Sequence, residues 1–377
     1  MEPQGEIEMA TPRERPPFRA DHIGSLLRPS ILRQAHRDHA AGKISSADFL
    51  HILDDCIRGI VRLQETLGLK VVTDGEFRRV SYWGRFVDRT EGFEIRPASF
   101  KFRDDSGHEV EFTAPYAARK ICRSQPLALD EFVFLRDNTQ AVPKITLPAP
   151  STMHFYRCKD FADKSAYNDV ETFFDDVVAL FRAELKELAD AGCRYVQLDE
   201  VAIAMLCDPA IRATVEREGQ DPFELVDLYV DAINRSVAGL PDDMSIGVHI
   251  CRGNFKGNYL SEGGYDSVAE ILFNTSDVSH FLLEYDTPRA GDFKPLRFVP
   301  KNIGIVLGLV SSKTPLLESE DSLRRRIGEA AQIIDLSQLA ISPQCGFAST
   351  VAGNPVSETD QAKKLKLCVD VARKVWG

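Results

Sequence analysis

Two residues of types that bind soft metals stand close together in one apolar segment. His249 and Cys251 are two positions apart at the end of IGVHIC, residues 246–251. On an extended strand, residues i and i+2 point to the same face, so the imidazole and the thiol would project together. Alone this pair is a weak metal signal, because a single cysteine or histidine is more often a packed core residue.

Two later segments end in further metal-binding side chains. Glu284 lies in HFLLEY, residues 280–285, and Cys345 ends LAISPQC, residues 339–345. Together with His249 and Cys251 they form a coherent tetrahedral zinc set of one imidazole, one carboxylate and two thiolates. The long gaps between the segments do not fit a zinc finger, but they suit strand ends that a barrel gathers around one point. The sequence therefore predicts Zn²⁺ as the cofactor.

Carboxylates and arginines follow other apolar segments. Glu76, Arg78 and Arg79 come directly after KVVTD, Asp199 ends YVQLD, and Arg252 follows the second predicted zinc ligand. We interpret Glu76 and Asp199 as catalytic acids. Arginine is suited to binding oxyanions, so Arg78, Arg79 and Arg252 are predicted to bind an anionic substrate tail. The alternative for the arginines is ordinary ion pairing on loops.

The elements that must position these side chains are short, apolar and β-branched, as strands buried on both faces should be. Eight such segments alternate with amphipathic ones, which predicts an α/β fold of the (β/α)8 TIM barrel type. Active sites in that fold lie at the C-terminal ends of the strands, where all four proposed zinc ligands stand. The predicted strands are Phe18–Ile23, Lys70–Asp74, Lys144–Leu147, Tyr195–Asp199, Ile246–Cys251, His280–Tyr285, Ile303–Val310 and Leu339–Ser342.

One long segment departs from this alternation. The predicted strands two and three are separated by an insertion at residues 86–142, which has β-hairpin character. Among the amphipathic segments the clearest helix spans Glu171–Ala191, with Gly192 placed to end it. We expect residues 1–17 to be a disordered leader and residues 18–377 to form a single barrel domain.

Bulk composition excludes several classes of protein. The 377 residues are 44% hydrophobic and 27% charged, a globular composition large enough for a substantial core. The net charge of −11 argues against nucleic-acid binding, and we expect no membrane segment because no long apolar run occurs. The polar N-terminus is not a secretory signal, and the eight scattered cysteines suggest a reducing compartment, so we predict a cytoplasmic protein.

Six separated motifs carry a resemblance to a known family. In order, they are DHIGSLLRP at 21–29, VVTDGEFRR at 71–79, YVQLDE at 195–200, VHICRGN at 248–254, FLLEYD at 281–286 and ISPQCGFAST at 341–350. The chain resembles the catalytic half of the cobalamin-independent methionine synthases, above all their short single-barrel branch (methionine synthase II-like). That branch includes the epoxyalkane:coenzyme M transferase, or 2-hydroxypropyl-CoM lyase.

The resemblance implies a thiol substrate, activated on zinc, that attacks a carbon electrophile. It implies that His249, Cys251, Glu284 and Cys345 are the zinc ligands. By the same resemblance, the turn of Ile23–Ser25 holds the carboxylate of homocysteine, with Ile23 and Ser25 as substrate-binding residues. The acids Glu76 and Asp199 would hold its ammonium group.

Two substrate pairs remain open. The arginines and the missing folate-binding half favour a zinc-activated coenzyme M thiolate that opens a short epoxyalkane; the alternative is methyl transfer to homocysteine, with an uncertain methyl donor. A zinc-binding or corrinoid-partner module without its own chemistry, or a metal-free decarboxylase, would be a different class. The expected partners are a small-molecule thiol and a small electrophile. A homo-oligomer is expected from the family and from the insertion.

Overall fold

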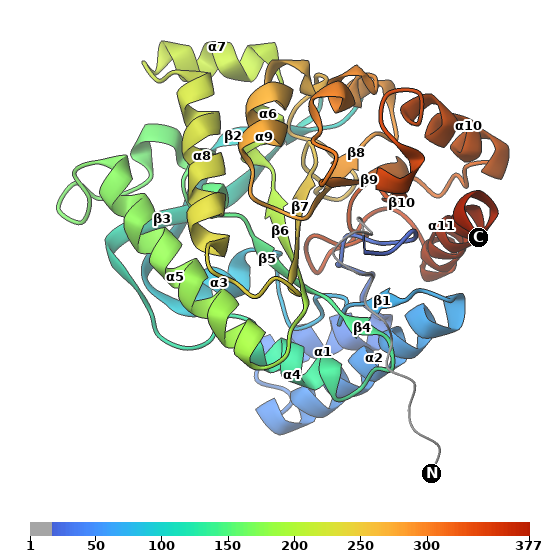
Figure 1. The fold of residues 1–377 in the computed structure, drawn as a ribbon. Helices are drawn as coiled ribbons and strands as arrows, with labels where there is room; N and C mark the ends of the chain where they lie inside the picture. Colours follow the sequence, from blue (N-terminus) through green and yellow to red (C-terminus); the bar gives the residue numbers. More distant parts are fainter. Residues whose placement is uncertain (1–16) are drawn as a thin grey trace.

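The strands follow one another around the molecule in chain order, with helices outside them (Figure 1). The computed structural model describes residues 17–377, so the expected leader, apart from Pro17, lies outside the described residues. Six strands form a parallel sheet in the spatial order β10-β9-β8-β7-β6-β5, and β1 pairs in parallel with β4. The parallel strands are β1 (Val71–Val72), β4 (Val142–Pro143), β5 (Ile145–Pro148), β6 (Tyr195–Glu200), β7 (Ser245–Ile250), β8 (His280–Glu284), β9 (Gly304–Val310) and β10 (Leu339–Pro343).

The segment that completes the ring is shorter than predicted. Instead of a full strand over Phe18–Ile23, the structure has one parallel bridge, between Ala20 and Ile341 of β10. On the other side, the backbone N–H of Leu26 donates to the carbonyl of Gly75 at 3.1 Å. The first segment thus lies between β10 and the end of β1. The predicted α/β barrel is confirmed, with a weaker first strand.

The second predicted strand, Lys70–Asp74, is also shortened, because a side chain takes its backbone hydrogen bonds. The Gln64 side chain accepts from the N–H of Thr73 at 3.0 Å and donates to its carbonyl at 2.9 Å. The Thr73 hydroxyl donates to the carbonyl of Gly24 at 2.7 Å. The amide of Gln64 therefore takes the place of a neighbouring strand at this point.

Helices cover the outer surface of the strands. The clearest predicted helix is present as α5, which begins after the side chain of Asp169 caps Thr172 N–H and ends before Gly192, whose φ is +95°. No helix within residues 17–377 is both long and apolar enough to span a bilayer. The α-helices are α1 (Ser30–Ala40), α2 (Ser46–Leu67), α3 (Gly84–Asp88), α4 (Leu129–Arg136), α5 (Val170–Asp190), α6 (Ala202–Met205), α7 (Pro209–Arg217), α8 (Pro222–Val237), α9 (Ala269–Thr275), α10 (Glu320–Ala330) and α11 (Glu358–Trp376). Short 3-10 helices are η1 (Pro150–Met153), η2 (Phe155–Asp160), η3 (Tyr265–Ser267), η4 (Pro288–Ala290), η5 (Lys294–Phe298) and η6 (Leu336–Gln338).

The segment between β1 and β4 contains a long antiparallel hairpin. Its strands are β2 (Thr90–Arg103) and β3 (Glu109–Arg123). Near the tip, Arg103 and Tyr259 exchange backbone hydrogen bonds of 2.8 and 2.9 Å, and Tyr259 lies in the loop after β7. Because that loop follows the C-terminal end of a barrel strand, the hairpin lies against the barrel mouth, where the candidate site is.

Candidate metal centre

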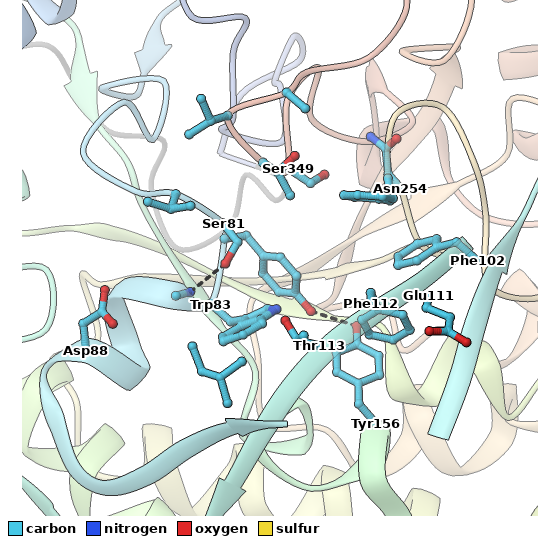
Figure 2. A pocket seen from close by; sticks show the side chains of 18 residues that line it. Ser81, Trp83, Asp88, Phe102, Glu111, Phe112, Thr113, Tyr156, Asn254 and Ser349 are labelled. Atoms are coloured by element: carbon cyan, nitrogen blue, oxygen red, sulfur yellow. Dashed lines mark hydrogen bonds between the residues drawn. The ribbon is translucent and has the colours of Figure 1, made fainter. Parts of the chain in front are cut away.

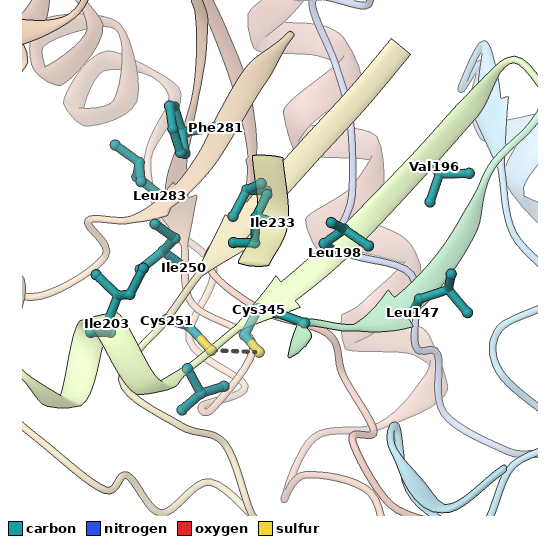
Figure 3. Packing of buried hydrophobic residues seen from close by; sticks show 14 of the residues in the cluster. Leu147, Val196, Leu198, Ile203, Ile233, Ile250, Cys251, Phe281, Leu283 and Cys345 are labelled. Atoms are coloured by element: carbon teal, nitrogen blue, oxygen red, sulfur yellow. Dashed lines mark hydrogen bonds between the residues drawn. The ribbon is translucent and has the colours of Figure 1, made fainter. Parts of the chain in front are cut away.

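Three side chains from distant parts of the sequence meet at the C-terminal end of the barrel. Ligand atoms of His249, Cys251 and Cys345 all lie within 4.8 Å of one another, and all three residues are buried. His249 belongs to β7, Cys251 is the first residue after β7, and Cys345 comes two residues after the end of β10. Figure 3 shows the two thiols facing each other. The strand ends gather these residues as the barrel prediction requires.

The spacing of the two sulfur atoms suits a tetrahedral zinc ion. Cys251 Sγ and Cys345 Sγ are 3.7 Å apart. Two Zn–S bonds of about 2.3 Å at a tetrahedral angle separate their sulfurs by about 3.8 Å. The hydrogen bond shared with Cys251, and the neighbouring His249 imidazole, hold the pKa of the Cys345 thiol well below its ordinary value, although burial opposes this. A thiolate is the form that binds metals.

The imidazole is oriented with one nitrogen free. His249 Nδ1 lies 3.1 Å from the carbonyl oxygen of Leu282, while the buried Nε2 has no hydrogen-bond partner. If Nδ1–H donates to that carbonyl, the lone pair of Nε2 is left for a metal, an arrangement common among metal-binding histidines. The unpaired Nε2 is the second observation that fits a zinc ion.

Glu284 is the one predicted ligand outside this group. It ends β8, the strand next to β7, and its Oε2 accepts a hydrogen bond from the backbone N–H of Arg252 at 2.7 Å. Its other oxygen, Oε1, is buried without a partner. Burial favours the neutral acid, but the charges of Lys313 and Arg252 outweigh it and lower the pKa of Glu284. An ionised carboxylate with one free oxygen thus ends the strand next to β7. The three converging donors His249, Cys251 and Cys345 fit zinc, and Glu284 remains the predicted fourth ligand.

A small cavity of about 50 Å³ opens on these donors. Besides His249, Cys251 and Cys345, it is lined by Ile23, Ser25, Glu76, Tyr82, Phe102, Tyr156, Asp199, Val201, Gly253, Asn254, Gly346 and Ser349. The two predicted catalytic acids and both predicted turn residues therefore lie at the same cavity as three of the four predicted metal ligands.

Glu76 is held in an unusual backbone conformation. Its φ is +59°, which is uncommon for a residue with a side chain, and Asp74 Oδ1 accepts its N–H at 2.8 Å. Glu76 Oε1 accepts a hydrogen bond from the Thr146 hydroxyl at 2.8 Å, while Oε2 is buried without a partner. Burial raises the pKa of Glu76, although Arg79 opposes the rise. This free oxygen is suited to accept a hydrogen bond from a donor group of a substrate.

Asp199 is held from inside the barrel. Gln197, two residues earlier on β6, donates to Asp199 Oδ1 at 2.7 Å, and Lys144 Nζ donates to Gln197 Oε1 at 3.0 Å. Burial raises the pKa of Asp199 to about 7; His249 opposes this rise, and the Glu76 carboxylate adds to it. Two neighbouring buried carboxylates are stabilised by a cation between them.

The predicted arginine subsite requires a correction. Arg78 pairs with Asp54 at 2.6 Å, and Arg79 pairs with the buried Glu131 at 2.6 Å. Arg79 Nη1 also lies 3.8 Å from Glu76 Oε1. The guanidinium of Arg252 donates to the carbonyls of Gly263 and Ala290 and to the hydroxyl of Tyr265. None of the three lines the cavity, so its described walls carry no arginine or lysine. These side chains are bound to protein partners that the sequence pattern could not reveal.

Sequence reasoning missed the residues that hold the acids in place. Thr146 and Gln197 are inside the barrel, and their contacts with Glu76 and Asp199 join different strands. One signal was available for Gln197: it lies two residues before Asp199, so both side chains point to the same face of β6. Asn254 and Tyr156, which line the cavity, were also missed.

Comparison with known proteins agrees with this geometry. Residues 18–374 match the family described as "Cobalamin-independent synthase, Catalytic domain". The chain belongs to this family. Among its relatives, "Uncharacterized protein YxjG" of Bacillus subtilis is 40% identical over 97% of this chain and 96% of its own, and "Methionine synthase" of Pyrococcus abyssi is 29% identical over 86% and 85%.

A solved family member has the same fold. The "Putative Vitamin-B12 Independent Methionine Synthase" of Listeria monocytogenes superposes with a TM-score of 0.75 at 32% identity, covering 96% of this chain and 98% of the other. The chain is therefore an enzyme of the methionine synthase-like methyltransferase type. The prediction that coenzyme M and an epoxide are the substrates has no support among these relatives.

Proposed function

We propose that this protein transfers a methyl group to the thiol of homocysteine and so forms methionine, with zinc held by His249, Cys251, Cys345 and Glu284. Zinc dependence is general in the family, and the spacing and free lone pairs of these side chains fit the ion. When bound, zinc would deprotonate a coordinated thiol and so supply a nucleophilic thiolate.

The observation that carries the homocysteine assignment is the pair of buried acids at the small cavity. Glu76 Oε2 is buried without a hydrogen-bond partner. Asp199 Oδ1 accepts a hydrogen bond from Gln197 inside the barrel. Arg79 Nη1 lies 3.8 Å from Glu76 Oε1, but Glu76 Oε2 has no partner, and an α-ammonium group would supply a cation to this oxygen and to Asp199. A sulfonate would instead meet two carboxylates, and no described lining residue of the cavity is arginine or lysine. Arg78 is paired with Asp54, Arg252 with the carbonyl of Gly263, and Arg79 with Glu131 and, at 3.8 Å, with Glu76.

The chain's own residues then orient the amino acid. Glu76 and Asp199 bind its ammonium group, and the turn of Ile23–Ser25 binds its carboxylate, as the family resemblance implies. Gly24 in this turn has φ +125°, and a Cβ there would lie 2.6 Å from Thr146 Cγ2, so only glycine fits. Held at both ends, the substrate places its thiol at the predicted metal ligands, and the surrounding aromatic side chains exclude water.

Calorimetry on the zinc-loaded protein tests this assignment. Homocysteine, coenzyme M and 4-sulfanylbutanoate, which lacks the amino group, are titrated in two buffers to follow proton release. We expect homocysteine to bind with release of its thiol proton. Loss of the amino group should weaken binding by about 10- to 150-fold, because a hydrogen bond to a charged group contributes about 1.5–3 kcal/mol. In Asp199→Asn that difference should shrink. Tighter binding of coenzyme M than of homocysteine would overturn the assignment.

A further inference from the structure

A second, larger cavity adjoins the candidate site. Its volume is about 690 Å³, and it lies between the β2–β3 hairpin and the loops that follow β1 and β10. Five residues line both cavities: Tyr82, Phe102, Tyr156, Asn254 and Ser349. The large cavity therefore opens onto the predicted thiol site, and it has the size of a site for a second small molecule.

The walls of this cavity are aromatic (Figure 2). Phe102 and Phe112 come from the two strands of the hairpin and pack edge to face, with ring centroids 4.9 Å apart. The rings of Phe112 and Tyr156 are nearly perpendicular, with centroids 5.1 Å apart. Trp83 adds an indole from the loop after β1. The hydroxyls of Tyr82 and Tyr156 lie 2.8 Å apart and share a hydrogen bond. Asn254 Oδ1, also on the wall, is buried without a partner, so a hydrogen-bond acceptor stands beside the ring surfaces.

The charges on these walls are all negative. Asp88 and Glu111 line the cavity, while none of its described lining residues is lysine, arginine or histidine. Elsewhere in the protein, cations cover aromatic rings, as Arg96 does over Tyr116 at 3.4 Å. Among the rings that line the cavity, Phe255 is covered by Lys256, whose Nζ lies 5.2 Å from the ring centroid. In the described part of the chain no such contact involves the other five rings, those of Tyr82, Trp83, Phe102, Phe112 and Tyr156.

We propose that this cavity binds the methyl donor and that the donor is a methyl-onium cation, either a sulfonium or a quaternary ammonium compound. Proteins recognise quaternary ammonium groups with cages of aromatic rings, and this cavity presents five rings that no cation of the described chain covers. An anionic donor, such as a folate with a glutamate tail, would face Asp88 and Glu111, and no described lining residue of the cavity is basic. A cation does lie near Glu111, since Lys101 Nζ is 3.9 Å from Glu111 Oε1. This inference rests on the proposed function and names its second substrate.

The transfer step balances without a proton donor. The homocysteine thiolate attacks the methyl carbon, a new C–S bond forms, and the bond from that carbon to the onium sulfur or nitrogen breaks. The electron pair of the broken bond stays on the leaving atom, which becomes neutral. Since charge is lost in this step, an apolar aromatic cavity suits it, and the tyrosines on the wall need not protonate a leaving group.

A donor panel tests the inference directly. Zinc-loaded protein and homocysteine are supplied with S-methylmethionine, glycine betaine, 5-methyltetrahydrofolate triglutamate or methylcobalamin, and methionine is quantified. We expect methionine from at least one onium donor. If the folate or the corrinoid is the productive donor and neither onium compound is, the inference is overturned while the proposed function stands. If homocysteine itself does not bind with proton release, the proposed function fails instead.

A binding measurement gives a readout independent of turnover. Choline is compared with 3,3-dimethylbutan-1-ol, its uncharged carbon isostere, by quenching of tryptophan fluorescence, because Trp83 lines the cavity. We expect choline to bind about 5- to 30-fold more tightly, the range that cation–π contacts give. Equal affinity for the two compounds would contradict a cation site.

Variants locate the binding. Phe112→Leu removes a half-buried ring from the cavity wall and Trp83→Leu removes the indole, and both should abolish most of the preference for choline. Because Trp83→Leu also removes the fluorophore, both compounds are titrated against all the variants by calorimetry. The matched control is Phe100→Leu on β2, because Phe100 stacks on Phe155 at 5.2 Å and does not line the cavity. Homocysteine binding should be unchanged in all three. A preference that survives in both cavity variants would refute the assignment.

Discussion

Gln197 connects the interior of the barrel with the candidate substrate site, and its replacement by glutamate separates these two roles. Gln197 is fully buried; its amide nitrogen donates to Asp199 Oδ1 at 2.7 Å and to the carbonyl of Ile23 at 2.6 Å, while its oxygen accepts from Lys144. Gln197→Glu keeps the shape and the contact with Lys144 but removes both donated hydrogen bonds. It also places a second carboxylate beside Asp199.

The size of the effect follows from the hydrogen bond that is lost. A hydrogen bond to a charged group contributes about 1.5–3 kcal/mol, so kcat/KM for homocysteine should fall by about 10- to 150-fold. We expect most of the change in KM, because Asp199 is proposed to bind the ammonium group. The added carboxylate should also raise the pKa of Asp199 beyond its present value of about 7, so the acidic limb of the kcat/KM profile should move to higher pH.

The assay is the initial rate of methionine formation by zinc-loaded protein at varied homocysteine and pH, with zinc content and thermal unfolding measured in parallel. Gln338→Glu is the matched control, since Gln338 is also buried and donates to the carbonyls of Pro300 and Ile303 at 2.9 and 2.8 Å, before the start of β10. Gln338→Glu should lose stability without a change in KM or in the pH profile. Unchanged KM and pH profile in Gln197→Glu would refute the positioning of Asp199 by Gln197.

Three further outcomes are expected. Cys251→Ala or Cys345→Ala should remove most zinc and most activity and leave a folded barrel. Metal analysis measures the zinc content, and circular dichroism checks the fold. Full zinc retention in either variant would show that the replaced cysteine is not a ligand. Arg78→Ala should leave kcat/KM within about two-fold, because a partly exposed ion pair such as Arg78–Asp54 contributes little free energy. A large rise in KM would instead indicate that Arg78 binds an anionic part of the substrate. Burial raises the pKa of Glu200 to about 7 in the folded protein, so between pH 4.5 and 7 the folded state binds more protons than the unfolded state. Glu200→Gln should therefore gain about 3 kcal/mol relative to wild type as pH rises through that window, measured by urea unfolding; parallel pH curves would contradict it.

The local pattern of the chain predicted most of the barrel because buried parallel strands have a characteristic composition. The strands from Tyr195 onward were predicted within a residue or two, since each is a continuous apolar run with no competing structure. The first two predicted strands are shorter in the structure than in the prediction: the first is reduced to one bridge, and the second to the two residues of β1. Their backbone hydrogen bonds go partly to the Gln64 side chain and to single bridges, which no local pattern reveals.

The types of the site residues, too, could be predicted from the sequence. His249, Cys251 and Cys345 are soft ligands at strand ends, and a barrel brings strand ends together whatever their distance in the chain. The same rule placed Glu76 and Asp199 at the cavity. These predictions needed only the strand order and the chemistry of the side chains.

Only the tertiary structure decided which charges face the substrate. Arg78, Arg79 and Arg252 are near the site in sequence, but long guanidinium side chains reach whichever acceptor the packing offers, and here the acceptors are Asp54, Glu131 and the carbonyl of Gly263. The direction of a flexible side chain depends on contacts between distant segments, whereas the ending of a strand depends on neighbouring residues. For that reason the sequence by itself predicted the side chains that could hold a metal, and the fold decided which charged side chains line the cavity beside them.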